Sequence, residues 1–180
     1  MENPVKTKWG IDPTHSEIAF KVKHLMITNV KGTFKQFEAS IFTTDGNFIT
    51  SEIEFSLNPA SIDTGVSDRD GHLKSADFFD VENHKEITFK GTSVENIDDE
   101  NYTLVGDMEI KGISKQIKLD VEFGGVMKDP WGNEKAGYII TGKISRKDWG
   151  LNWNATLETG GLLVSDEVKI TCEVQLIKQS

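Results

Sequence analysis

Apolar and charged side chains alternate along most of this chain, and residues 117–123 show the pattern without a fault. Side chains of a β-strand point to opposite faces with a period of two, so this segment has one apolar and one charged face. The same alternation recurs along the chain in about eight long strands at hairpin-like spacing. Such a series is typical of an antiparallel barrel or sandwich, so the sequence predicts an all-β domain.

The expected strands are separated by glycine-rich and polar turn signals. Turns are expected at residues 44–47, at Gly112 and at residues 129–133, and Gly124 with Gly125 should end the strand that begins at Ile117. The strands themselves are expected over residues 16–25, 30–34, 37–42, 52–57, 86–92, 102–111, 117–123, 136–144 and 167–176.

One stretch departs from the alternation and predicts a short helix near residues 68–79. Ser67 stands where an N-cap residue would accept a backbone hydrogen bond, and Asp70 follows three residues later. Leu73, Ala76 and either Phe78 or Phe79 would then share one apolar side of the helix.

Composition and charge narrow the classes of protein. The chain has 180 residues, 27% of them charged and 9% aromatic, which suits one folded domain over residues 1–180. A net charge of -9 with no basic stripe makes nucleic acid an unsuitable partner. No apolar run reaches the length of about 18 residues that a transmembrane helix needs.

The same data predict a compartment. The first ten residues lack the apolar stretch of a signal peptide, and the single cysteine, Cys172, has no partner for an internal disulfide. We therefore expect a cytoplasmic protein, or a periplasmic one if a signal peptide has been removed from the chain.

Several short motifs, taken in order, resemble the YceI-like family. They begin with residues 9–16, Phe20, Val22, His24, Gly32 and Phe34. They continue with Thr64, residues 69–70, 72–73, 77–80 and 87–89, and they end with Gly137, Arg146, residues 148–151 and 164–168. No single motif is specific, but their order and spacing together are, and the resemblance extends from about Trp9 to Leu176.

The resemblance implies a fold and a ligand. It implies an extended eight-stranded antiparallel lipocalin-like barrel with one short helix near one end. It also implies that a long apolar lipid of polyisoprenoid, isoprenoid quinone or fatty-amide type is carried, stored or sequestered in the barrel. Members of the family are often dimers, so we expect a homodimer, with no cofactor other than the bound lipid.

The residue pattern agrees with such a site. Eight strands enclose an interior that side chains just fill or that holds one small ligand. Strands of about ten residues at roughly 3.3 Å per residue make a channel of about 33 Å, long enough for an extended chain lipid. We expect the ligand to contact inward-facing side chains, namely Phe20, Val22, His24, Phe34, Phe55, Leu57, Phe78, Phe89, Met108, Leu119, Val121, Phe123, Tyr138, Ile140, Trp149 and Ile170.

The polar residues near this face leave alternatives open. His24 could donate a hydrogen bond to a lipid head group or be satisfied within the core. Arg69 with Asp70, and Arg146 with Asp148, could form buried ion pairs, grip a phosphate head group, or serve in helix capping and barrel closure. The four histidines have no recognised ligand spacing, so no metal site is expected, and Cys172 is expected to be inert packing.

Three functions remain to be compared. The first is a lipid-binding protein without catalysis, and no catalytic residue is expected. The second is an enzyme acting on a lipid held in the barrel, for which His24 is the single inward-facing acid or base. The third is a filled barrel that acts as a protein-interaction module.

Overall fold

A closed antiparallel barrel of eight strands forms the body of the protein. The computed structural model describes residues 3–154 and 163–179. The ring runs β1–β4–β5–β7–β8–β9–β10–β11, and pairing of β11 with β1 closes it. This confirms the expected barrel. Its strands are β1 (Lys6–Ile11), β4 (Phe37–Thr44), β5 (Asn47–Leu57), β7 (Ile87–Asn96), β8 (Asn101–Ile110), β9 (Ile113–Lys128), β10 (Glu134–Ser145) and β11 (Val164–Lys178).

A second group of strands extends the sheet beyond the ring. It consists of β2 (Glu17–His24), β3 (Thr28–Phe34) and β6 (Ile62–Asp63). The long strand β11 pairs with β1 at its C-terminal end and with β2 over the rest of its length. The 3₁₀ turn η1 (Pro13–His15) separates β1 from β2, and the two strands pair with successive parts of β11.

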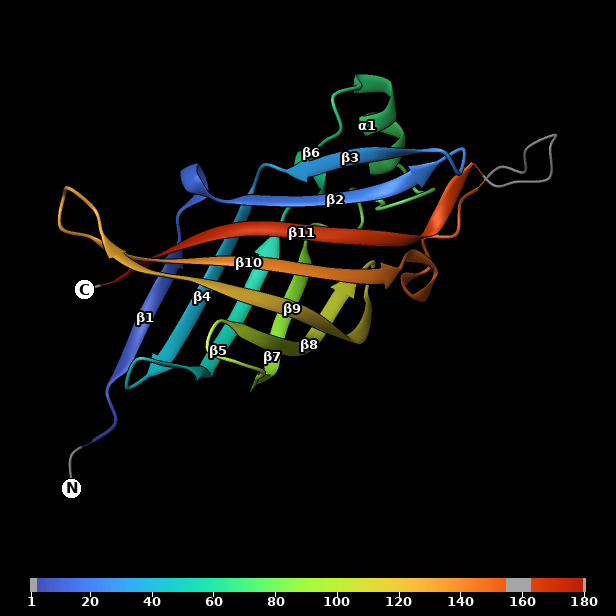
Figure 1. The fold of residues 1–180 in the computed structure, drawn as a ribbon. Helices are drawn as coiled ribbons and strands as arrows, with labels where there is room; N and C mark the ends of the chain where they lie inside the picture. The colour runs from blue at the N-terminus through green and yellow to red at the C-terminus, as the bar shows by residue number, and fades with distance from the viewer. Residues whose placement is uncertain (1–2, 155–162, 180) are drawn as a thin grey trace.

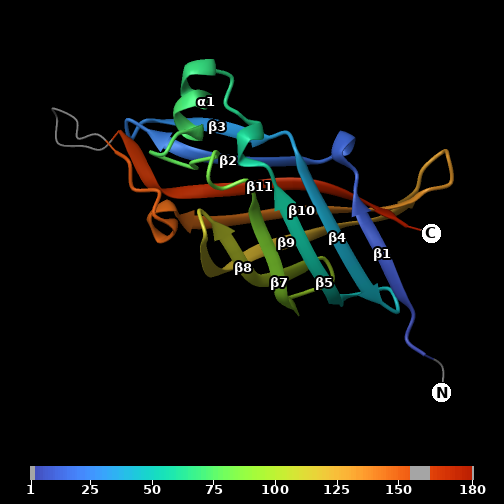
Figure 2. The ribbon, with the colours of Figure 1, turned by 180° about the vertical axis from the view of Figure 1, so that it is seen from behind.

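The strands form two layers that cross one another. Figure 1 shows β9, β10, β11 and β2 running across the front, while β1, β4, β5, β7 and β8 run steeply behind them. Figure 2 shows the second layer from its own side, with the hairpin of β2 and β3 and the hairpin of β9 and β10 at opposite ends of the molecule. This flattened arrangement gives the barrel a long interior.

The register of β9 follows the alternation of its sequence. Leu119 and Val121 are buried inside the barrel, whereas Lys118, Asp120 and Glu122 are exposed. The polar side chains keep their hydration on one face while the apolar ones are removed from water on the other. The sequence prediction for this segment is confirmed.

The end of this strand differs from the prediction. Gly124 and Gly125 do not end β9, which continues to Lys128. Gly137 of β10 pairs with Gly125 and Tyr138 pairs with Phe123, so Gly124 is the extra residue of a β-bulge. A glycine within a strand is compatible with such a bulge because the backbone bends there without a side chain to accommodate.

The expected helix is present but shorter than predicted. Helix α1 comprises Ser67–Lys74, and Val66 is its N-cap without a side-chain hydrogen bond, so the predicted capping by Ser67 is wrong. The Ser75 hydroxyl donates to the His72 carbonyl at 2.5 Å, and the backbone of Ser75 is extended. This local bond competes with helix continuation. No helix within the described ranges is long and apolar enough to cross a membrane.

Two further 3₁₀ turns are η2 (Pro59–Ser61), between β5 and β6, and η3 (Arg146–Trp149), which directly follows β10. Trp149 is only 1% exposed, so η3 anchors one end of the barrel to its core.

Asp12 fastens the corner between β1 and β2. Its carboxylate accepts hydrogen bonds from the backbone nitrogen and hydroxyl of Thr14 at 3.0 and 2.7 Å, and it contacts Lys135 Nζ at 3.1 Å and His15 Nδ1 at 2.9 Å. Burial alone would raise the pKa of this carboxyl. The bonds from Thr14, His15 and Lys135 outweigh burial and hold the pKa well below its ordinary value.

We expect Asp12→Asn to destabilise the fold by about 1–3 kcal/mol at neutral pH, because the amide cannot replace these bonds to an anion. The pKa of Asp12 is lower in the folded than in the unfolded state. The carboxylate therefore contributes its full stabilisation above the unfolded-state pKa, and this stabilisation is lost progressively as the pH falls from there through the folded-state pKa. Denaturant melts of both proteins should therefore converge in acid. The exposed Asp99→Asn is the control, and a constant difference down to the lowest accessible pH would contradict the assignment.

Candidate functional site

The barrel contains a cavity of about 390 Å³ that is partly open to solvent and whose wall is almost wholly apolar. Its lining comes from every strand of the ring and from β2, β3, α1 and η3, so the cavity extends along the interior. Pockets of a few hundred Å³ with apolar walls and few polar groups are typical of small-molecule sites.

Most of the residues expected to contact a ligand lie on this wall. They are Phe20, Val22, His24, Phe34, Phe55, Leu57, Phe78, Phe89, Met108, Leu119, Val121, Tyr138, Ile140 and Ile170. Their common position follows from the period of two, since each occupies an inward-facing place on its strand or lies beside α1. That a ligand contacts them stays a prediction.

Two residues of the predicted set are not part of the lining. Phe123 packs against Tyr138, with ring centroids 5.2 Å apart, in a small separate cluster at the end of the barrel. Trp149 lies in the core, where its indole nitrogen donates to the Met108 carbonyl at 2.9 Å. A buried indole needs such an acceptor, and this bond holds the ring away from the cavity.

The cavity also has lining residues that the sequence pattern did not single out as contacts. Phe48 stacks on Tyr138 with centroids 4.8 Å apart, and Trp153 packs edge-to-face on His72 at 4.7 Å. Phe48 lies near the start of β5, before an irregularity that reverses the alternation of the strand, and Trp153 belongs to a segment without regular structure, so alternation identifies neither. The aromatic content of these two segments was the available signal.

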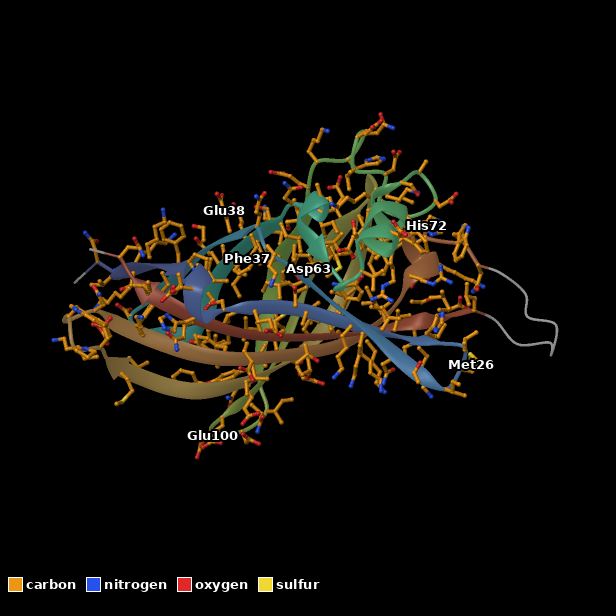
Figure 3. All side chains as sticks on the ribbon, turned by 90° about the horizontal axis from the view of Figure 1, so that it is seen from above. Met26, Phe37, Glu38, Asp63, His72 and Glu100 are labelled. Atoms are coloured by element: carbon orange, nitrogen blue, oxygen red, sulfur yellow. The ribbon has the colours of Figure 1, made fainter. Side chains whose placement is uncertain are left out.

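All the ionisable groups that line the cavity, apart from Tyr138 and Cys172, are cationic or imidazole groups. They are Lys23, His24, Arg69, His72 and Arg146, and no acidic residue from the described ranges joins them. They come from the end of β2, from α1 and from η3. Figure 3 shows His72 on α1 at the same end of the molecule as Met26 of the β2–β3 turn. The cavity therefore has one basic end.

Arg69 and Asp70 organise the entry to α1 and do not pair with each other. Arg69 Nε donates to Thr64 Oγ1 at 2.8 Å and Arg69 Nη2 donates to the Thr64 carbonyl at 2.7 Å. Asp70 accepts hydrogen bonds from the backbone nitrogen of Thr64 at 2.9 Å and from its hydroxyl at 2.5 Å. Both residues thus fix the segment before the helix, while Arg69 also faces the cavity.

Arg146 holds the chain that follows η3. It is only 3% exposed and donates to the carbonyls of Ser165, Leu151 and Trp153 at 2.9, 2.6 and 2.8 Å. Its acidic neighbour is Asp166 at 3.8 Å, so the ion pair with Asp148 that the sequence left open is not formed, and Asp148 is exposed. Burial lowers the pKa of Arg146, and Asp166 partly opposes this shift.

The Cys172 and His15 side chains are not arranged as a nucleophile and a base. Burial raises the pKa of the Cys172 thiol to about 11, which keeps it from acting as a thiolate. Asp12 and Thr14 contact the same ring nitrogen of His15, so His15 does not bridge an acid and a nucleophile. Within residues 3–154 and 163–179, no three His, Cys, Asp or Glu side chains converge as a metal site.

Comparison with known proteins places the chain among similar barrels. The YceI-like domain family matches residues 9–176. A UPF0312 protein of Staphylococcus epidermidis is 41% identical over 170 residues, which cover 94% of this chain and 96% of that protein. The crystal structure of a Campylobacter jejuni YCEI protein is similar with a TM-score of 0.73 and 34% identity, covering 88% of this chain and 90% of that one.

A more distant structure shares the fold. A polyisoprenoid binding domain from Saccharophagus degradans, implicated in plant cell wall breakdown, aligns with a TM-score of 0.67 at 15% identity. The alignment covers 95% of this chain and 98% of that domain. The barrel architecture is thus common to proteins with little sequence identity.

Proposed function

Because this chain belongs to the YceI-like family, we propose that it binds a long-chain apolar lipid inside its barrel as a carrier, store or sequestering protein. The observation that carries the proposal is the cavity inside the barrel with its apolar wall. The barrel of the Saccharophagus degradans domain, which is described as polyisoprenoid-binding, supports the ligand class. Polyisoprenoids, isoprenoid quinones and fatty amides all present the required chain.

Burial of the chain would supply the affinity. Transfer of apolar surface from water is favourable by about 25 cal/mol per Å², or about 0.8 kcal/mol for each methylene group. The aromatic and aliphatic side chains of the wall offer few polar groups that could discriminate between chains. Such a site selects by length and apolarity, and the polar head decides the orientation.

We place the polar head of the lipid at the basic end of the cavity. The His24 imidazole has no hydrogen-bond partner among the described residues and can donate to a head-group oxygen. The guanidinium of Arg146 donates to backbone carbonyls, so it would attract the head group by its charge and not by hydrogen bonds. Arg69 donates from Nε and Nη2 to Thr64. The opposite end has the stacked rings of Phe48 and Tyr138 and would receive the end of the chain.

Two other functions receive less support. A lipid-modifying enzyme needs an acid or base poised at the ligand, and the cavity offers the imidazoles of His24 and His72, of which His72 contacts Asp77 at 2.9 Å. Among the described residues, neither ring contacts a hydroxyl or thiol that could serve as a nucleophile. A protein-interaction module would need no internal cavity. We therefore propose binding without catalysis. We also propose that the protein acts as a homodimer, and light scattering during size-exclusion chromatography tests this.

A pair of variants on one strand tests the proposal. Ile170 faces the cavity, and Ile170→Trp would fill part of it. Thr171 is exposed on the outer face of the same strand, so Thr171→Trp is the matched control. Organic extraction of each purified protein, followed by mass spectrometry, should find a nearly stoichiometric chain lipid in the wild type and the control. We expect roughly fivefold or more loss of lipid in Ile170→Trp because the added ring displaces buried ligand surface.

Melting temperatures of both variants must be measured so that unfolding is separated from loss of the site. A folded Ile170→Trp protein that retains as much lipid as the control would contradict binding in the cavity. An empty wild-type extract, with no uptake of added polyprenol or quinone, would reject the function itself.

A further inference from the structure

The turn between β2 and β3 has an unexpected composition. The Ile27 nitrogen donates to the His24 carbonyl at 3.2 Å, which leaves Leu25 and Met26 as the central residues. Their φ angles are 54° and 63°. The register pairs His24 with Thr28, so the loop has three residues, of which Leu25 and Met26 are the central residues of a β-turn. Positive φ at both central positions of such a turn favours pairs such as Asn-Gly or Asp-Gly, because a side chain with a Cβ is strained there.

Two other turns of this chain use the favoured residue. The β4–β5 turn has Asp45 and Gly46 with φ angles of 53° and 72°, and the β8–β9 turn has Lys111 and Gly112 with φ angles of 52° and 75°. Each has glycine at the second position. The β2–β3 turn therefore accepts backbone strain that these other turns reduce, and strain kept in a fold points to a function.

The strained turn also exposes apolar side chains to solvent. Met26 is 52% exposed and Ile27 is 80% exposed, while Leu25 is 38% exposed. Figure 3 shows Met26 at the same end of the molecule as His72 of α1. Three consecutive large apolar residues in an exposed turn are unfavourable in water unless another phase or surface receives them.

A row of four lysines crosses the outer face of the sheet behind this tip. Lys31 pairs in register with Lys21, Lys21 with Lys169, and Lys169 with Lys143, across β3, β2, β11 and β10. Like charges directly opposite one another destabilise a sheet. None of the four has an ion pair within the described ranges, and Glu167 is the nearest acid on the same face of β11.

We propose that this end of the barrel docks on an anionic lipid bilayer. Leu25, Met26 and Ile27 enter the interface between head groups and acyl chains, and the lysine row meets the anionic head groups. Surface-bound proteins attach to such membranes by inserting apolar side chains while neighbouring basic side chains contact the anionic head groups. The surface is notable because the chain as a whole carries a net charge of -9.

Docking in this way would bring the cavity to the membrane. His24 ends β2 directly before the apolar turn, and both His24 and Lys23 line the basic end of the cavity. A lipid leaving the bilayer at the docked tip would therefore meet that end first. Docking does not depend on which lipid the cavity holds, so it can be tested separately from the proposed function.

The opposite end of the barrel lacks this combination. Met127 and Trp131 are 76% and 82% exposed there. Of the neighbouring cations, Lys135 contacts Asp12 and Asp129, whereas Lys128 has no ion pair within the described ranges and belongs to no row of lysines like the one behind the β2–β3 turn. These exposed residues make the opposite end a suitable internal control.

Co-sedimentation with vesicles of equal parts phosphatidylcholine and phosphatidylglycerol tests the proposal. The full chain should bind these vesicles at low salt. Its affinity should be roughly tenfold or more lower for vesicles of pure phosphatidylcholine, and also in about 0.5 M salt, where charges are screened within a few ångströms. The double variant Leu25→Asn/Met26→Gly relieves the strain of the turn. We expect it to be as stable as the wild type or more stable, yet to bind roughly tenfold or more weakly.

Two further double variants separate charge from location. Lys21→Glu/Lys169→Glu should lose roughly tenfold or more in vesicle binding, since each lysine near an anionic surface contributes to the attraction. Lys8→Glu/Lys128→Glu changes the net charge equally at exposed positions away from the tip and should bind better than that variant. Trp131→Ser should bind as the wild type does.

Several outcomes would overturn the proposal. They are a wild type that does not bind anionic vesicles, a Leu25→Asn/Met26→Gly variant that binds as strongly as the wild type, and a loss that follows Trp131→Ser instead. A wild type that ignores vesicles but whose dimer dissociates in the Leu25→Asn/Met26→Gly variant would assign the tip to a second copy of the chain.

Discussion

Leu119→Asp should unfold or severely destabilise this protein, at a cost of several kcal/mol. Leu119 is 6% exposed and faces the cavity, in contact range of the Gly142 position on β10. A carboxylate there would lose its hydration, and no cation of the basic end of the cavity belongs to β9 or β10. Thermal and denaturant unfolding followed by circular dichroism measure the effect, and bound lipid should fall with it.

Glu122→Lys is the matched control on the same strand. Glu122 is exposed on the outer face, and a charge reversal there should change stability by about 0.5 kcal/mol or less. Similar losses of melting temperature in the two variants would mean that the register of β9 is wrong.

Arg146→Met should be the second most damaging of these changes, with a cost of about 3–5 kcal/mol. Methionine fills similar volume but leaves the carbonyls of Leu151, Trp153 and Ser165 without their donor in a buried place. Asp166 would also lose its buried cationic neighbour. For a chain of this length the melting temperature should fall by about 10 °C.

Two comparisons make the Arg146 result specific. Lys147→Met removes the exposed neighbour that contacts Asp166 at 3.2 Å, and it should cost about 1 kcal/mol or less. Arg146→Lys keeps the charge but offers no planar fork, so it should recover only part of the stability. Full recovery by lysine would show that charge, and not the bonds to three carbonyls, holds this segment.

The barrel could be predicted from the sequence because alternation reports directly on burial. Along residues 117–123 of β9 and 167–176 of β11, each inward residue is apolar and its neighbours are polar or charged, so a shift of one residue would place every charge inside. The same period of two identifies most of the side chains that form the cavity wall. This period depends only on the spacing of residues along each strand, so it is the same for any order of the strands around the ring.

The alternation fails where the backbone is irregular. Counting back from Leu57 in β5 predicts Ile49 inside and Phe48 outside, yet Phe48 lines the cavity and Ile49 is 44% exposed. The register between β4 and β5 shifts after Phe42, and Ser51 Oγ donates to the Phe48 carbonyl at 2.5 Å. An added residue in one strand reverses the faces beyond it, and no hydrophobic pattern announces the shift.

By itself, then, the sequence determined an all-β chain with inward apolar faces, because each strand records its own burial in its residues. Tertiary structure alone decided three further features. It decided that β11 closes the ring with β1 while it also pairs with β2, and that Arg146 binds carbonyls and Asp166 instead of Asp148. It also aligned lysines from four strands into one row. These features join residues distant in the chain, and only the register between strands brings them together.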